Sequence, residues 1–202
     1  MKDINFLIAG VGGQGTILVS DIMAEVGVLT GYDVKKTDVL GLAIRGGSVI
    51  SHIRWGEKVD APMSMRGKVD YLLAFEPLEA LRQIEFLNGR STIVFNEYKI
   101  HPVTVSSGLA TYPADDVLVK SLKDSAKNIY SLNATNQAVE IGNVKTMNVL
   151  LLGALTPFLD IEMEIWEKAI KKFVPEQLKG INLKAFHAGR EMIKVKIKET
   201  IV

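Results

Sequence analysis

Short apolar runs alternate with amphipathic segments along the first half of the chain. Residues 16–31 place apolar side chains at helical spacing, and Pro77 stands where a second helix can begin. Five other runs have the apolar, β-rich composition of strands: residues 4–9, 32–39, 48–55, 71–75 and 91–95. The helix after Pro77 is predicted to bury one face, formed by Leu78, Leu81, Ile84 and Leu87.

The second half of the chain is less regular and richer in helical patterns. Its predicted elements are an edge strand at 103–105, a helix at 115–122, a strand at 129–133, a long helix at 136–158 and a final amphipathic helix at 183–198. Asp160 is predicted to cap a further helix, in which glutamates precede lysines, the charge order that suits a helix macrodipole. No internal repeat or linker-like tract divides the chain.

Strands and helices that alternate across glycine-marked turns are typical of a doubly wound sheet. We therefore predict an α/β fold, a doubly wound, Rossmann-like, mostly parallel sheet with C-terminal helices. Between the second and third predicted strands, the three glycines of residues 40–47 indicate a loop of unusual backbone shape. The 202 residues are expected to form one domain.

The charge balance excludes some classes of partner. The chain has 24 basic and 23 acidic residues, a net charge of +1, so no overall electrostatic attraction to nucleic acid or an anionic membrane is expected. The longest apolar stretch, 147–159, is shorter than the roughly 20 residues of a membrane-spanning helix and is predicted to be a buried core helix. Asp3 and the early glycines differ from a signal peptide. We expect a cytoplasmic protein.

Cysteine is absent from the chain. Because thiolates are the usual ligands of iron–sulfur clusters and structural zinc, this chain alone can hold no cysteine-ligated cluster, and it can use no thiol nucleophile. The three histidines, His52, His101 and His187, lie far apart, which favours core or surface roles over a shared metal site. No metal site is predicted.

Gly10, Gly12 and Gly15 satisfy the pattern G-x-G-x-x-G between a predicted strand and a predicted helix. Glycines in this context allow a tight turn and let a phosphate approach backbone N–H groups at the positive end of the helix. Gln14 adds an amide donor and acceptor that a purely structural turn would not need. The motif is therefore a candidate phosphate or nucleotide site, although the same glycines also suit a close strand-to-helix crossing without a ligand.

A dinucleotide site also needs an acidic residue at the end of the second strand, to bind the ribose hydroxyls. Asp38 stands near that place, but Lys35 and Lys36 precede it and Gly41 follows it closely. An NAD-dependent reductase is thus an alternative from another enzyme class, although no constellation for hydride transfer accompanies it. A non-catalytic assembly subunit, with glycines used for packing alone, is a third reading.

A second glycine motif, Arg45-Gly46-Gly47-Ser48, directly precedes the third predicted strand. Arg45 offers a planar fork of donors suited to phosphate or carboxylate, while Gly46 and Gly47 let the backbone approach a ligand or another chain closely. An exposed arginine beside a hairpin-like turn is the ordinary alternative. The presence of the first motif favours a binding role for the second.

Four segments of the chain resemble a known family, the gamma-type subunits or domains of 2-oxoacid:ferredoxin oxidoreductases. They are residues 10–15 (GVGGQG), 41–54 (GLAIRGGSVISHIR), 74–80 (AFEPLEA) and 148–154 (NVLLLGA). Because they span nearly the whole chain, residues 1–202 are identified as a single pyruvate/ketoisovalerate oxidoreductase gamma-type domain. The indolepyruvate branch is nearest, with Ile44 where that branch often has glutamine.

The resemblance implies a subunit, inactive alone, of a complex that oxidatively decarboxylates indolepyruvate or other aryl pyruvates. Such a complex uses coenzyme A and ferredoxin, and forms an aryl-acetyl-CoA, carbon dioxide and reduced ferredoxin. It also implies thiamine diphosphate, Mg²⁺ and iron–sulfur clusters on a larger alpha subunit, since this chain has neither cysteine nor a G-D-G diphosphate motif. The expected partners are that alpha subunit and, through the complex, ferredoxin.

The two glycine motifs are expected to line one surface near the partner's active site. The candidate binding residues are Gly10, Gly12, Gly13, Gln14, Gly15, Arg45, Gly46, Gly47 and Ser48. Their expected ligands are the phosphates of coenzyme A or the backbone of the partner. Glu76, at a strand end, is predicted either to face a ligand or to cap the helix at Pro77. Asn148 marks either an interface or a satisfied core contact.

Overall fold

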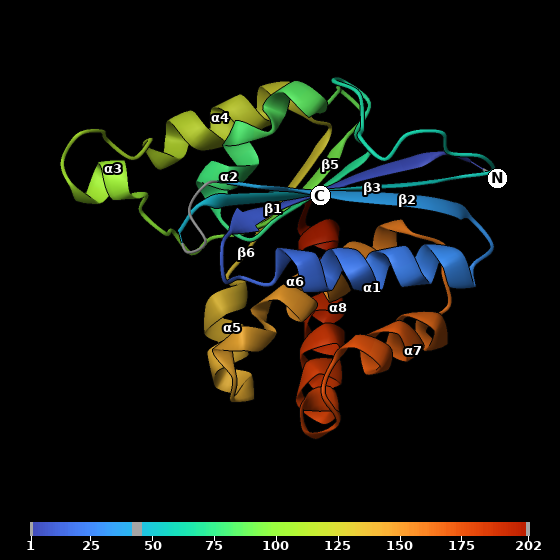
Figure 1. Cartoon of the computed structure of the whole chain (residues 1–202). Coiled ribbons are helices and arrows are strands. Elements are labelled where there is room, and N and C mark those ends of the chain that lie inside the picture. Colours follow the sequence, from blue (N-terminus) through green and yellow to red (C-terminus); the bar gives the residue numbers. More distant parts are fainter. Residues whose placement is uncertain (1, 42–45, 201–202) are drawn as a thin grey trace.

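A six-stranded sheet with helices on both faces forms the body of the protein (Figure 1). The computed structural model describes residues 2–41 and 46–200. In the order β2-β3-β1-β4-β5-β6, the strands are Asp33–Leu40, Ser48–Gly56, Ile4–Val11, Tyr71–Ala74, Thr92–Asn96 and Asn128–Leu132. Strand β1 is therefore central, and the predicted α/β class with a mostly parallel sheet is confirmed.

One strand runs against the others. β4 is parallel to β1, and β5 and β6 continue in the same direction, whereas β3 is antiparallel to both β1 and β2. The seven residues 41–47 join β2 to β3, and a parallel crossover needs a dozen or more. The two strands therefore form a hairpin, which brings the start of β3 beside the end of β1.

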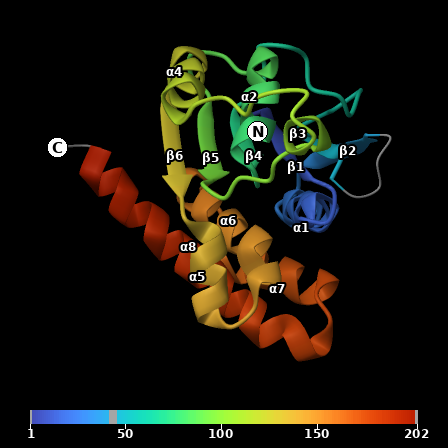
Figure 2. The ribbon, with the colours of Figure 1, turned by 90° about the vertical axis from the view of Figure 1, so that its left-hand side faces the viewer.

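Helices cover the two faces unequally (Figure 2). Their bounds are α1 Thr16–Leu29, α2 Pro77–Arg82, α3 Val103–Ser106, α4 Asp115–Ser125, α5 Ala134–Ile141, α6 Met147–Leu155, α7 Met163–Phe173 and α8 Lys179–Thr200. Helices α2 and α4 lie on one face, and α1 and α5–α8 lie on the other. Because side chains alternate along a strand, Leu7 and Ala9 of β1 join the first layer, and Phe6 and Ile8 join the second.

The core of the larger layer depends on a close crossing of α6 and α8. Every residue of α6 is buried, as predicted for the apolar stretch around it. A Cβ added to Gly153 would lie 1.9 Å from the carbonyl oxygen of Phe186, and one added to Gly189 would lie 1.8 Å from that of Leu150. Each helix therefore contributes a glycine where the other helix's backbone approaches. Within the described part of the chain, no helix is long and apolar enough to cross a membrane.

The prediction of a single long helix at 136–158 is wrong, because two helices, α5 and α6, occupy this segment. Helix α5 ends at Ile141, where Gly142 adopts φ 114° and donates its N–H to the carbonyls of Ala138 and Val139. Asn143 then caps a 3-10 turn at 144–146, which leads into α6. A left-handed glycine after a helix is a common C-cap, so the Gly142-Asn143 pair was a stop signal in the sequence.

Several smaller expectations also differ. Residues 103–106 form the short helix α3 instead of an edge strand, and three of the four are exposed. Helix α7 begins at Met163 after Glu162, so Asp160 is not its cap. On α2, Leu78 and Leu81 are only partly buried, whereas Glu79 is buried. The final helix begins at Lys179, earlier than predicted.

We expect Gly189→Ala to destabilise the fold by about 1–3 kcal/mol or more, because the new methyl group meets backbone that cannot move independently. Gly180→Ala, on the same helix, is the matched control. Nothing lies within 4 Å of its added Cβ, so higher helix propensity should leave stability equal or slightly greater. Urea unfolding of both variants measures the difference. Equal midpoints would contradict the close crossing.

His52 is a buried histidine on β3. It is 1% exposed, its Nδ1 accepts a hydrogen bond from the Ser64 backbone N–H at 3.3 Å, and its ring contacts Phe86 edge-on. Burial lowers its pKa below the ordinary 6.5. The folded protein therefore resists protonation of this ring more than the unfolded chain does.

We expect the stability that depends on neutral His52 to be complete above pH 6.5 and to fall as the pH drops below that value. The sign follows because the unfolded state binds the proton more readily. His52→Gln should flatten this part of the curve of unfolding free energy against pH, relative to the parent. A steeper curve in the variant would contradict the assignment.

Candidate functional site

The carboxyl ends of β1 and β4 define a crevice. The chain leaves β1 toward α1 on one face of the sheet, and it leaves the neighbouring β4 toward α2 on the other face. Ligands of open α/β sheets bind where adjacent strands send their connections to opposite faces. Both glycine motifs and the Phe75-Glu76-Pro77 segment lie at this edge, so the candidate site is there.

The first glycine motif forms the turn between β1 and α1. Gly13 and Gly15 adopt φ 101° and 84°, the left-handed region that favours glycine. At Gly10, an added Cβ would lie 2.9 Å from Thr16 Oγ1 and 3.1 Å from the Phe75 ring. No side chain caps α1, and Thr16 Oγ1 is buried without a hydrogen-bond partner among the described residues. The positive end of α1 is therefore free to receive an anion.

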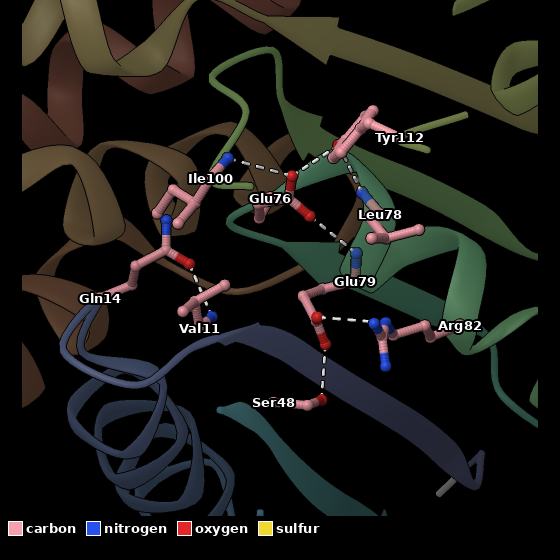
Figure 3. Close-up of polar contacts among 9 residues, drawn as sticks. All are labelled: Val11, Gln14, Ser48, Glu76, Leu78, Glu79, Arg82, Ile100 and Tyr112. Carbon is pink, nitrogen blue, oxygen red and sulfur yellow. Dashed lines mark hydrogen bonds and ion pairs between the residues drawn. The ribbon is translucent and has the colours of Figure 1, made fainter. Parts of the chain in front are cut away.

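The Gln14 side chain forms hydrogen bonds within the protein. Its Oε1 accepts from the Val11 N–H at 2.7 Å, and its Nε2 donates to the Phe75 carbonyl at 2.9 Å. Figure 3 shows this amide at the end of β1. The side chain thus ties the glycine turn to the end of β4. The sequence suggested that this amide binds a ligand, but both of its hydrogen bonds go to the protein's own backbone.

The structure brings the two glycine motifs together. The Gly12 N–H donates to the Gly47 carbonyl at 2.8 Å, and Ser48 lies opposite Val11 in the sheet register. Gly46 adopts φ 77°. Arg45 lies outside the described residues. The β2–β3 hairpin produces this contact, because it starts β3 where β1 ends.

Two buried carboxylates of α2 face this edge (Figure 3). Glu76 caps α2 by accepting from the Glu79 N–H at 2.9 Å, which confirms the capping prediction. Its other oxygen accepts from Tyr112 Oη at 2.5 Å and from the Ile100 N–H at 3.2 Å. Burial and the Glu76 carboxylate raise the pKa of Tyr112 far above its usual range, so this hydroxyl remains a donor. Glu79 accepts from Ser48 Oγ at 2.5 Å.

Pockets open on both sides of the glycine turn, and Gly13 and Gly15 line each of them. One, of about 410 Å³, extends toward Leu40 and Gly41 of the hairpin. The other, of about 430 Å³, has a mainly apolar wall and reaches to Lys145.

Asn148 and Lys145 are two of the polar residues that line the larger pocket beside the glycine turn, and of these two only Asn148 was singled out from the sequence. Asn148 is 5% exposed, its Oδ1 accepts from the Val149 N–H, and its Nδ2 has no partner among the described residues. An added Cβ at Gly15 would lie 2.0 Å from this Nδ2, so glycine makes room for the amide. Lys145 is exposed and forms no ion pair within residues 2–41 and 46–200. No sequence motif pointed to Lys145, which reaches the pocket because α5 ends at Ile141 and the chain turns at Gly142.

Asp38 is not placed to bind a ribose beside the glycine turn. Its Oδ1 accepts from Ser51 Oγ at 2.5 Å, and its Oδ2 lies 2.9 Å from Lys36 Nζ. Strand β3 also separates β2 from β1, whereas the dinucleotide fold pairs those two strands directly. The described residues contain no group of three or more histidine or carboxylate side chains that could hold a metal ion.

Comparison with known proteins identifies the family. The model for the pyruvate ferredoxin/flavodoxin oxidoreductase family matches residues 5–192, so the chain belongs to this family. The indolepyruvate oxidoreductase subunit IorB of Thermococcus kodakarensis is 39% identical over 197 residues, which are 96% of this chain and 98% of that protein. The resemblance inferred from the motifs is thereby confirmed.

Solved structures share the fold. The gamma subunit of a keto/oxoacid ferredoxin oxidoreductase from Geobacter sulfurreducens is 25% identical, with a TM-score of 0.67 over 95% of this chain and 99% of that one. A 2-oxoglutarate:ferredoxin oxidoreductase from Magnetococcus marinus is 19% identical, with a TM-score of 0.76. The chain covers 32% of that longer polypeptide, so the fold occurs both as a separate subunit and as part of a larger chain.

We expect Gln14→Leu to cost about 1–3 kcal/mol, because the Val11 N–H and the Phe75 carbonyl each lose a partner at a partly buried position. Gln137→Leu is the control, since Gln137 is only half-buried and, among the described residues, its side-chain amide bonds only Glu140; it should change stability by less than about 0.5 kcal/mol. Urea unfolding compares the two. A Gln14 variant as stable as the control would show that its amide does not tie the strand ends.

Proposed function

We propose that this chain is the smaller subunit of an indolepyruvate:ferredoxin oxidoreductase. The complex would oxidise an aryl pyruvate with coenzyme A and two oxidised ferredoxins, giving an aryl-acetyl-CoA, carbon dioxide, a proton and two reduced ferredoxins. The similarity to the IorB subunit over nearly the full length of both chains supports this assignment. The whole chain would act as one gamma-type domain in the cytoplasm, without nucleic-acid or membrane partners.

The redox centres are assigned to the partner. This chain lacks cysteine, and its buried carboxylates at the sheet edge are already bonded to Tyr112, Ser48 and backbone N–H groups. Thiamine diphosphate with Mg²⁺ and the iron–sulfur clusters therefore belong on the larger alpha subunit, which would also pass electrons to ferredoxin. The chain described here would contribute a binding edge to a hetero-oligomer and would have no activity by itself.

Coenzyme A phosphates are the ligand that best fits the larger pocket. The observation that carries this proposal is the uncapped start of α1 beside the Asn148 amide and the Lys145 ammonium group. Together they offer backbone donors, a side-chain donor and a positive charge to an anion. The apolar wall, which includes Leu18 and Val174, suits the less polar parts of the same ligand. The solved Magnetococcus enzyme is described with coenzyme A and succinyl-CoA bound.

The partner's backbone is the alternative occupant of the glycine turn. Gly13 and Gly46 are left-handed glycines with open space around the place of a Cβ, so another chain can approach them as closely as a phosphate can. An NAD-dependent reductase has less support, because Asp38 is held by Ser51 and Lys36.

We expect Lys145→Ala to raise the KM for coenzyme A about five-fold or more in the complex reconstituted with its larger subunit, with little change in kcat, because it removes a phosphate contact worth roughly 1 kcal/mol or more. Lys123→Ala, an exposed lysine of α4, should leave KM unchanged. Calorimetric titration with coenzyme A and with NAD provides an independent measurement. An unchanged KM in Lys145→Ala and Arg45→Ala would favour the partner's backbone, and saturable NAD binding would favour the reductase.

A further inference from the structure

Helix α2 is short, but it joins two loops that flank the glycine turn. It follows β4 and packs over β1, β4 and β5. Glu76, at its start, holds the segment after β5 through Ile100 and Tyr112. Glu79, one turn later, reaches the start of β3 on the other side of β1. Figure 3 shows the two carboxylates pointing toward these different partners.

We infer that Glu79 is a positioning residue, which holds Gly46, Gly47 and Ser48 of the second glycine motif against the glycine turn through the hydroxyl of Ser48. The inference rests on the proposed function for its kinetic consequence, because the glycine turn against which Glu79 holds the hairpin also lines the pocket assigned to coenzyme A. It adds to that proposal a residue that fixes the position of the β2–β3 hairpin beside the glycine turn.

Glu79 is a buried carboxyl group with a partner for each of its two oxygens. Glu79 is 4% exposed. Its Oε2 accepts a hydrogen bond from Ser48 Oγ at 2.5 Å, and its Oε1 lies 3.4 Å from Arg82 Nε. Burial and the nearby Glu76 carboxylate raise the pKa of Glu79, whereas the hydrogen bond from Ser48 and the positive charge of Arg82 lower it. A carboxylate so close to a phosphate site would repel the ligand if it faced it directly, so its contribution is expected to pass through Ser48.

The position of Ser48 matters because the residue before it, Gly47, forms the backbone hydrogen bond that joins the two glycine motifs. The Gly12 N–H donates to the Gly47 carbonyl, and the Gly41 N–H donates to the Ser48 carbonyl at 2.9 Å. Among the described hairpin residues, only Ser48 forms a side-chain hydrogen bond to α2, and this bond crosses the end of β1. A change at Glu79 should therefore loosen the hairpin base, while the turn after β1 keeps the hydrogen bond that the Val11 N–H donates to Gln14 Oε1.

The test is a double-mutant cycle in the reconstituted complex, with coenzyme A varied at saturating 2-oxoacid. Glu79→Gln and Ser48→Ala should each raise the KM for coenzyme A about five-fold, with kcat within two-fold of the parent. The double variant should be no worse than the more affected single variant, because both changes break one interaction. Ser48→Thr keeps the hydroxyl and should retain the parental KM. Glu191→Gln, in an exposed ion pair on α8, is the control.

Hydrogen exchange of the same complexes separates this inference from the proposed function. Faster exchange in peptides 9–15 and 46–50 of Glu79→Gln and Ser48→Ala supports the positioning role. If exchange quickens while KM is unchanged, the coenzyme A assignment fails and the positioning role stands. Unchanged exchange, multiplicative effects in the double variant, or a lower KM in Glu79→Gln would overturn the inference.

Discussion

The carbonyl oxygen of Phe75, directly after β4, joins three strand ends at the edge of the sheet that holds the candidate site. It accepts from Gln14 Nε2 at the end of β1 and from Asn96 Nδ2 at the end of β5, while the Phe75 N–H donates to the Ala9 carbonyl. Asn96 is fully buried and also bonds Thr135 at the start of α5. Since buried amides and carbonyls are costly to leave unpaired, these bonds fix the glycine turn, α2 and α5 relative to one another.

This arrangement decides which backbone donors remain for a ligand. The Gly12 and Gln14 N–H groups are occupied by the Gly47 and Val11 carbonyls. The positive end of α1 lies beyond them, without a capping side chain. The glycines thus serve two purposes in one turn: they let β3 and Asn148 approach closely, and they leave the first turn of α1 open beside a pocket.

The same edge explains how a chain without cysteine can belong to a redox enzyme family. Its ionisable groups in the crevice are engaged in holding loops: Glu76 holds the segment after β5, and Glu79 holds the start of β3. Under the proposed function, residues held in this way would position a binding surface. The electron carriers would lie on another chain, and this subunit would shape the place where a substrate meets them.

The sequence by itself determined the strand and helix alternation, the glycine turn after β1 and the cap at Glu76, because these depend on local spacing and on side chains that act within a few residues. It also identified the family, since its motifs occur together at characteristic separations. Tertiary structure decided the rest. The reversal of β3, the engagement of Gln14 by Phe75 and the arrival of Lys145 at the pocket depend on residues far apart in the chain. Such contacts depend on packing and on the pairing of buried polar groups. A local sequence pattern does not show which distant residues will meet.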